Sequence, residues 1–218
     1  IGTRALSSVM VVKADENSGV NVSTKHITYC TSGMYCNALV TAGLSDAKVT
    51  VVGPFDISGT SALVGAMKAY SVMTGEEISE KTMDTAIDEL VTTAEVAKNV
   101  GDKQKVTELV AAAKKAVFED QLSSETDIRD AIEQAANELS IDLSDDDVEK
   151  LTNMMMKVSN EDIDPDTIAK QASDIYNKLK EKGIDLANVD TKGLSEKIGD
   201  FFGNIFTAIA NFFSGLFG

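Results

Sequence analysis

The sequence has little of the material from which metal centres and catalytic dyads are built. Its 218 residues include one His, two Cys and no Trp. A structural zinc normally takes four Cys or His ligands, and His26, Cys30 and Cys36 are only three. A thiol nucleophile with His26 as its base is equally disfavoured, because four residues of regular strand separate His26 and Cys30 by about 13 Å. We therefore expect no enzyme activity and no metal or cofactor.

Basic residues are also scarce. The chain has 20 of them against 35 acidic residues, which gives a formal charge of −15. Such a chain repels phosphate backbones, so nucleic acid is not an expected partner. The 43% of hydrophobic and 25% of charged residues are ordinary for a globular protein. They exclude a wholly disordered chain and a polytopic membrane protein.

The charge is unevenly distributed along the chain. Residues 1–75 contain five basic and four acidic residues, whereas residues 76–218 contain 15 basic and 31 acidic ones. A near-neutral first part and a strongly acidic second part predict two regions with different surfaces.

The near-neutral region has the pattern of a small α/β unit. Residues 7–14 and 19–28 are rich in Val, Ile and Thr, as strands are. The turn-forming residues 15–19 between them predict an antiparallel hairpin. Apolar spacing predicts a helix over 34–42, ended by Gly43.

The rest of this unit is expected to be a strand and a helix. The strand covers residues 47–52 and is stopped by Gly53-Pro54, because proline lacks the amide that a sheet requires. The helix starts near residues 58–60 and runs through Tyr70.

The acidic region has helical periodicity throughout. Ser144 and the pair Asp164-Pro165 are typical of helix starts. Short loops between the helices favour a bundle packed against the α/β unit. The expected helices cover residues 77–99, 103–119, 124–139, 145–158, 165–182 and 194–217. We therefore predict an α+β fold with a small α/β domain (1–75), an acidic helical region (76–192) and a hydrophobic amphipathic C-terminal helix (193–218).

Four stretches of the chain resemble a known family. They are residues 1–8 (IGTRALSS), 34–43 (MYCNALVTAG), 53–63 (GPFDISGTSAL) and 89–93 (ELVTT). They are similar to the YpuA-like family of secreted Gram-positive bacterial proteins, which carry a domain of unknown function. The resemblance implies a secreted or cell-surface location, and a signal peptide and a further segment ahead of Ile1. It implies no activity and no catalytic residue.

The two cysteines have two interpretations. They are either a disulfide between Cys30 and Cys36 or two small buried residues. The extracellular address that the resemblance implies favours the disulfide, because oxidising compartments preserve such bonds. The bond also requires Cys36 to lie in the first turn of its helix.

Three further motifs have plain structural explanations. Residues 58–61 (SGTS) follow a strand and open a helix, which suits anion binding, but helix capping explains them as well. The acidic runs 145–147 and 161–166 lack the central Gly and the final Glu of an EF-hand, and carboxylates favour helix N-termini. Residues 154–156 (MMM) are interpreted as core and contact surface, since Met fills irregular gaps.

The C-terminal segment carries the strongest signal. Six of the eight Phe residues follow residue 200, and no charge occurs from Phe201 to Gly218. At about 100° per residue, the bulky side chains form one helical face and small residues form the other. The bulky positions, which we predict to contact another copy or a membrane, are Ile198, Phe201, Phe202, Ile205, Phe206, Ile209, Phe212, Phe213, Leu216 and Phe217. The small positions, which allow close helix packing, are Gly199, Gly203, Thr207, Ala210 and Ser214.

This segment must be covered, since burying one Phe is worth about 1.5–3 kcal/mol. The cover is another copy of the chain, a membrane lipid surface, or the other helices of the same subunit. Interfacial helices usually carry basic residues on their polar face, and the last basic residue here is Lys197. We therefore predict a homo-oligomer that self-associates at the cell surface, as a fibre or layer, with membrane binding as the alternative.

Overall fold

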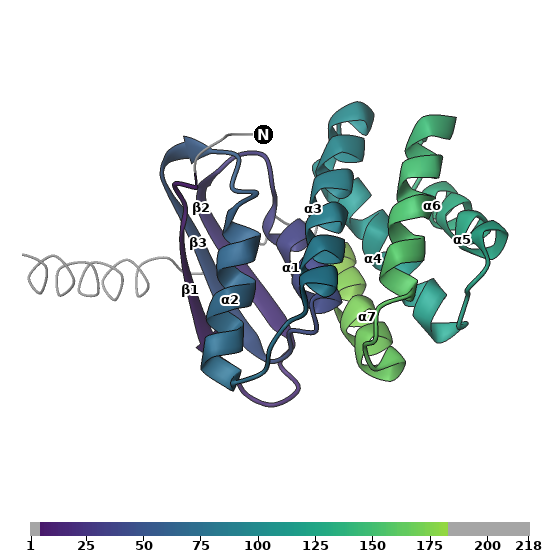
Figure 1. The fold of residues 1–218 in the computed structure, drawn as a ribbon. Coiled ribbons are helices and arrows are strands. Elements are labelled where there is room, and N and C mark those ends of the chain that lie inside the picture. The colour runs from purple at the N-terminus through teal and green to yellow at the C-terminus, as the bar shows by residue number, and fades with distance from the viewer. Residues whose placement is uncertain (1–4, 183–218) are drawn as a thin grey trace, which may run out of the picture. The chain divides into compact units, whose positions relative to one another are not determined.

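The computed structural model describes residues 5–182, which form a small sheet followed by a layer of helices (Figure 1). The α+β class predicted from the sequence is confirmed. The predicted helix over 194–217 lies outside the described residues. In chain order the elements are β1 (Ser8–Lys13), β2 (Val20–Ile27), α1 (Ser32–Thr41), β3 (Ala47–Ile57), α2 (Ala62–Thr74), α3 (Glu80–Val100), α4 (Lys103–Glu119), α5 (Glu125–Glu138), α6 (Asp145–Ser159) and α7 (Pro165–Lys182).

The sheet has the strand order β1-β3-β2, so the predicted hairpin of β1 and β2 is wrong. β3 lies between them, antiparallel to β1 and parallel to β2. The turn after β1 does reverse the chain, but it joins two edge strands. β3 takes the centre because its alternate residues Ala47, Val49 and Val51 are all fully buried there and need partners on both sides.

β3 also continues past Gly53-Pro54, where the sequence predicted its end. Register is maintained up to the pair Lys25–Val52 and resumes at Ile27–Ile57, so the single residue His26 opposes a bulge of β3. His26 has a left-handed backbone with φ of +56°. A Cβ atom on Gly53 would lie 2.7 Å from the carbonyl oxygen of His26. The glycine therefore permits a bulge instead of ending the strand.

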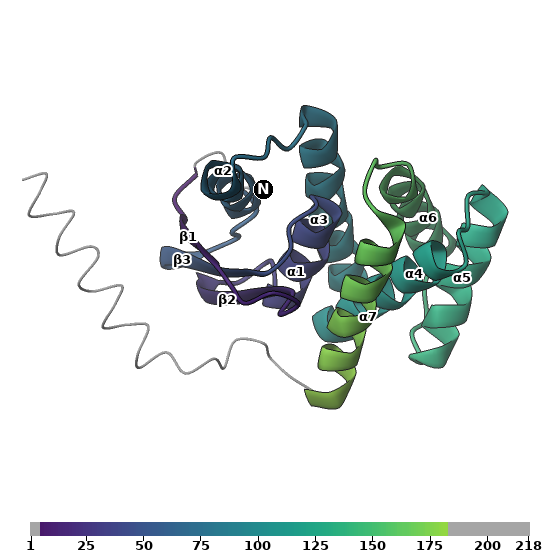
Figure 2. The same ribbon diagram turned by 90° about the horizontal axis from the view of Figure 1, so that it is seen from below.

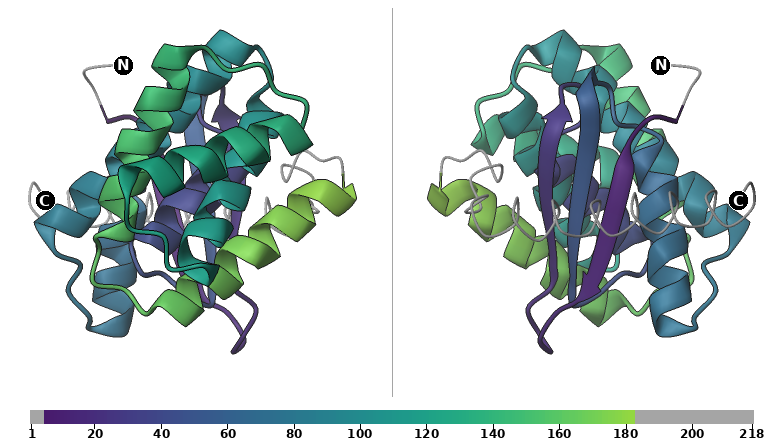
Figure 3. Two further views of the ribbon diagram at one scale, coloured as in Figure 1. Left: turned by 90° about the vertical axis from the view of Figure 1, so that its right-hand side faces the viewer. Right: turned by 90° about the vertical axis from the view of Figure 1, so that its left-hand side faces the viewer.

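Helices cover one face of the sheet only. α1 packs along β2 and α2 along β1, over a face made of Val9, Val20, Val22, Val49 and Val51. The opposite face, which includes the row Met10, Thr50 and Ser23, is not covered by any helix of residues 5–182 (Figure 3, right).

The second layer is built around α4, which packs against α1, α3, α5, α6 and α7. Figure 2 shows α1 and α3 between the sheet on one side and α4 to α7 on the other. All the described residues belong to one compact unit, across the boundary predicted at residue 75. The large hydrophobic side chains still exposed within residues 5–182 are Leu6, Val12, Phe55 and Val72. The core of this unit is therefore closed without further chain.

The helix boundaries agree closely with the sequence patterns. α4 and α7 have the predicted bounds, and the Ser144 hydroxyl accepts the amide of Asp147 at the start of α6. Asp164 accepts the amide of Thr167 in the same way at the start of α7. α2 begins later than expected, at Ala62.

Gly59 is the glycine whose replacement we expect to be most disruptive. Its φ is +88°, and a Cβ atom there would lie 2.5 Å from both the Tyr35 hydroxyl and Ile27 Cγ2. Gly59→Ala should lower the free energy of unfolding in urea by about 3 kcal/mol. Gly65→Ala is the control, because its Cβ would make ordinary contact with Val9 and a helix interior favours Ala by about 0.5–1 kcal/mol. Equal stability of the two variants would contradict the packing described.

Candidate functional site

A buried ion pair lies where α1, α3 and α4 meet. Lys114 of α4 and Glu89 of α3 are both fully buried, and Lys114 Nζ is 2.7 Å from Glu89 Oε1. The ammonium also donates to the Asn37 carbonyl oxygen and to Thr41 Oγ1 of α1, each at 2.7 Å. The Thr41 hydroxyl in turn donates to Glu89 Oε2 at 2.5 Å.

This network compensates both charges inside the protein. Burial lowers the pKa of Lys114, and the adjacent Glu89 carboxylate opposes that shift. Because neither side chain reaches solvent, the pair is not open to a substrate. Its role is to fix α1 of the sheet layer against α3 and α4 of the helical layer.

Both cysteines are free, buried thiols in the structure. This agrees with the interpretation of two small buried residues and not with a disulfide. Cys36 lies beyond the first turn of α1, and its thiol donates to the Val20 carbonyl oxygen at 3.6 Å. Cys30 lies instead against the Tyr35 hydroxyl. Burial raises the pKa of Cys30 to about 12 and that of Cys36 to about 11.

His26 lies in a different environment from the two buried thiols. His26 is exposed on the bulge, and its Nδ1 is 3.2 Å from Asp56 Oδ1. Within residues 5–182, no three His, Cys, Asp or Glu side chains are placed to hold a metal ion. The described helices also include none that is long and apolar enough to cross a membrane.

Residues of both acidic runs accept hydrogen bonds from side chains of α3. Asp147 is buried and accepts from the Asn99 side-chain amide at 2.8 Å. Glu161 is buried too and accepts from the hydroxyls of Thr82 and Thr85, both at 2.8 Å. Burial raises the pKa of Glu161, but the hydrogen bonds from Thr85, Thr82 and Lys81 outweigh it and hold that pKa below its usual value. These carboxylates connect α6 and the loop after it to α3.

Residues 58–61 do not cap α2 with a side chain, so that part of the interpretation is wrong. Ser61 is the N-cap residue, but its hydroxyl makes no capping bond. The stretch forms a backbone turn in which the Ala62 amide donates to the Gly59 carbonyl oxygen at 2.8 Å. That oxygen also accepts from the Tyr35 hydroxyl at 2.5 Å, which ties the turn to α1.

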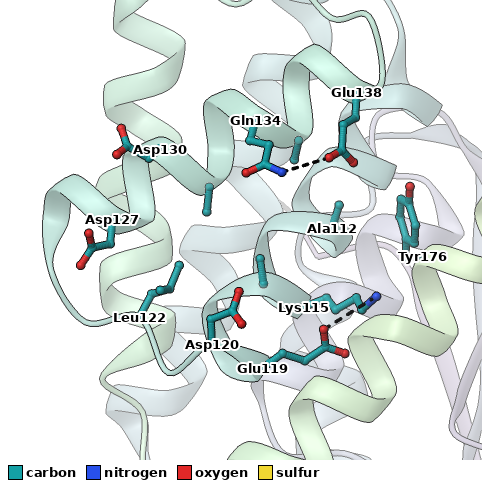
Figure 4. Close-up of a pocket in the computed structure, with 13 residues that line it drawn as sticks. Ala112, Lys115, Glu119, Asp120, Leu122, Asp127, Asp130, Gln134, Glu138 and Tyr176 are labelled. Carbon is teal, nitrogen blue, oxygen red and sulfur yellow. Dashed lines mark hydrogen bonds and ion pairs between the residues drawn. The ribbon is translucent and has the colours of Figure 1, made fainter.

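An acidic groove of about 400 Å³ lies between α4 and α5 and reaches Tyr176 of α7 (Figure 4). Lys115 and Gln134 each contact a carboxylate on their own helix, Glu119 and Glu138. The groove therefore favours positively charged solutes. The carboxylates that line it are Glu119, Asp120, Asp127, Asp130 and Glu138.

A second groove, the α3–α6 groove, has a volume of about 880 Å³. Its apolar residues are Ile87 and Val91 of α3 and Met156 of α6. Met154 and Met155 point into the core and are almost fully buried, whereas Met156 is only partly buried. Sequence reasoning missed this groove, because residues from positions near 85 and near 157 form it together.

The predicted oligomer or membrane contact, from Ile198 to Phe217, lies outside the described residues. So do the small positions Gly199, Gly203, Thr207, Ala210 and Ser214.

The family model described as "Protein of unknown function (DUF1002)" matches residues 1–175. The chain belongs to the DUF1002 family. It is also 39% identical, over 215 residues, to "Uncharacterized protein YpuA" of Bacillus subtilis (strain 168). That alignment covers 98% of this chain and 72% of the Bacillus protein. No solved structure matches the chain.

The stretches that resemble the YpuA-like family supply much of the buried network. Asn37 and Thr41 belong to residues 34–43, and Glu89 belongs to residues 89–93. A sequence signal for the network does exist: Glu89 and Lys114 interrupt the buried apolar stripes of α3 and α4. Periodicity alone cannot show that these two interruptions face each other.

Removing one member of the buried pair should destabilise the protein strongly. Lys114→Met leaves Glu89 buried without its partner, and we expect a loss of about 3–5 kcal/mol in the free energy of unfolding. Adding Glu89→Gln removes the remaining charge and should restore a large part of that loss. Urea unfolding of the wild type, both single variants and the double variant measures the coupling. Additive effects of the two substitutions would contradict a direct pairing.

The two thiols should be unreactive in the folded protein. Their raised pKa values leave little thiolate at pH 8, and burial blocks access. We expect almost no reaction with a thiol-specific disulfide reagent in native buffer, and two equivalents per chain in 6 M guanidinium, a concentration chosen as about enough to unfold most domains. Fast labelling of the native protein would contradict the buried positions.

Proposed function

We propose that this DUF1002 protein is a non-enzymatic protein of the cell surface that self-associates through its C-terminal segment, as a fibre or layer. The observation that carries the proposal is the uncharged run from Phe201 to Gly218 with its six Phe residues. The resemblance to a family of secreted proteins supports the extracellular location in this proposal.

The closed core of residues 5–182 supports the proposal. Large side chains such as Leu39, Leu109 and Leu151 are already fully buried in its hydrophobic cluster. Six Phe side chains left in water would cost on the order of 10 kcal/mol, which equals the whole stability of a typical domain. Contact between copies removes this cost.

Three features of the described unit argue against catalysis as the main role. The fully buried pair Glu89–Lys114 is closed to solutes, and the two thiols are held protonated. The carboxylates of the acidic groove are spread over two helices and the loops beside them, and two of them contact Lys115 and Gln134 of their own helices. A role in binding and assembly requires neither an accessible ion pair nor a reactive thiol.

Sedimentation velocity tests the proposal. The full chain should sediment as an oligomer, and a chain lacking residues 193–218 should sediment as a monomer. Phe202→Asp with Phe213→Asp should dissociate the full chain, since each places a charge on the aromatic face. Asn204→Asp with Asn211→Asp is the matched control, which adds the same charge beside that face and should remain associated.

Two results would contradict self-association. One is a monomeric full chain, and the other is a truncated chain that associates as strongly as the full one. Flotation with vesicles of phosphatidylglycerol and phosphatidylcholine separates the membrane alternative. A full chain that is monomeric alone but floats with vesicles has its aromatic face in lipid.

A further inference from the structure

The α3–α6 groove offers an apolar floor, and four of the five charged side chains that line it form ion pairs. Ile87, Val91 and Met156 supply that floor. Lys157 of α6 binds Asp88 of α3 at 2.8 Å. Lys81 donates to the Asn160 carbonyl oxygen at 3.0 Å and lies 3.3 Å from Glu161. An apolar ligand can therefore enter beside these two ion pairs without separating them, and Asp84, the fifth charged residue of the lining, is exposed to solvent.

Two other hollows of residues 5–182 do not suit an uncharged aromatic ligand. The acidic groove would expose such a ligand to five carboxylates that need water. A third hollow is lined mainly by polar side chains, among them Glu95, Lys98 and Lys150. The volume of about 880 Å³ in the α3–α6 groove is also in the range of sites that enclose apolar ligands.

We propose that the α3–α6 groove of one copy receives Phe side chains from residues 193–218 of a second copy. The proposal rests on the proposed function and names the receiving surface. The segment has no charge after Asp200, so its aromatic face matches the groove in polarity. Amphipathic helices bind grooves in this way, and a partly exposed Met such as Met156 adapts to the rings that enter.

The rim of the groove shields such a contact from water. Two salt bridges, Lys157–Asp88 and Lys81–Glu161, flank the apolar floor. Polar groups around a buried apolar centre exclude water from it while contributing little energy themselves. Each chain has one α3–α6 groove and one C-terminal segment. Each copy therefore inserts its segment into one neighbour and receives the segment of another. This is a heterologous contact, which produces a ring or an open filament.

Direct binding tests the groove. Residues 193–218 are fused to a fluorescently labelled monomeric carrier and titrated with the chain that ends at residue 192, whose core is closed. Fluorescence anisotropy should show saturable binding. Val91→Lys in the receiving chain should weaken it at least tenfold, whereas Thr92→Lys, next to it on α3 and outside the groove lining, should leave it unchanged. Met156→Lys, from the opposite wall, is the second variant if Val91→Lys does not fold.

No binding, or equal binding by the Val91→Lys, Met156→Lys and Thr92→Lys chains, overturns the proposal. In the full chain, an oligomer that Val91→Lys leaves intact also overturns it, while self-association through the segment still stands. A full chain that is monomeric overturns both. These outcomes separate the failure of the groove from the failure of the proposed function.

A mixing experiment tests whether the occupant is a second copy. The full chain with Val91→Lys keeps the C-terminal segment but has a blocked groove. The chain without residues 193–218 keeps an open groove but lacks the segment. A one-to-one complex of the two supports the proposal. If a monomeric full chain fails to bind the carrier that the truncated chain binds, its own segment occupies its groove, and the proposal is overturned.

Discussion

The arrangement of the two layers depends on one buried interaction, the ion pair of Glu89 and Lys114. Two charges without solvent are tolerated only when each has its partners, and here the partners come from three helices at once. Sliding or rotating α1 would separate Thr41 and the Asn37 carbonyl from the ammonium. Apolar contacts alone allow many similar packings, so this network selects one of them.

The same constraint shapes the surfaces that remain available. α1 is held by its polar side to α3 and α4, and it contributes its other side to the sheet. α3 then lies between the layers, and its outer side forms the α3–α6 groove with Met156. The groove is therefore a consequence of where the buried pair places α3. Its apolar floor comes from α3 and α6, and the loop after α6 adds Asn160 and Glu161 to its lining.

Local signals predicted the helices well, because the residues that decide them are close in sequence. Ser144 and Asp164 accept amides from the first turns of α6 and α7, and Pro165 occupies the first position of α7. The position of β3 between β1 and β2 could not be predicted, since it depends on pairs such as Val9 with Val51. The network joining Thr41, Glu89 and Lys114 was missed for the same reason.

The bulge at His26 has a consequence for the outer edge of the sheet. Within residues 5–182, one edge of β2 pairs with no strand, and regular edges of this kind promote strand addition and aggregation. The left-handed backbone of His26 interrupts the regular repeat of amides and carbonyls before Ile27. Lys25 adds a charge immediately beside the interruption. Strand addition between two copies at this edge is thereby discouraged.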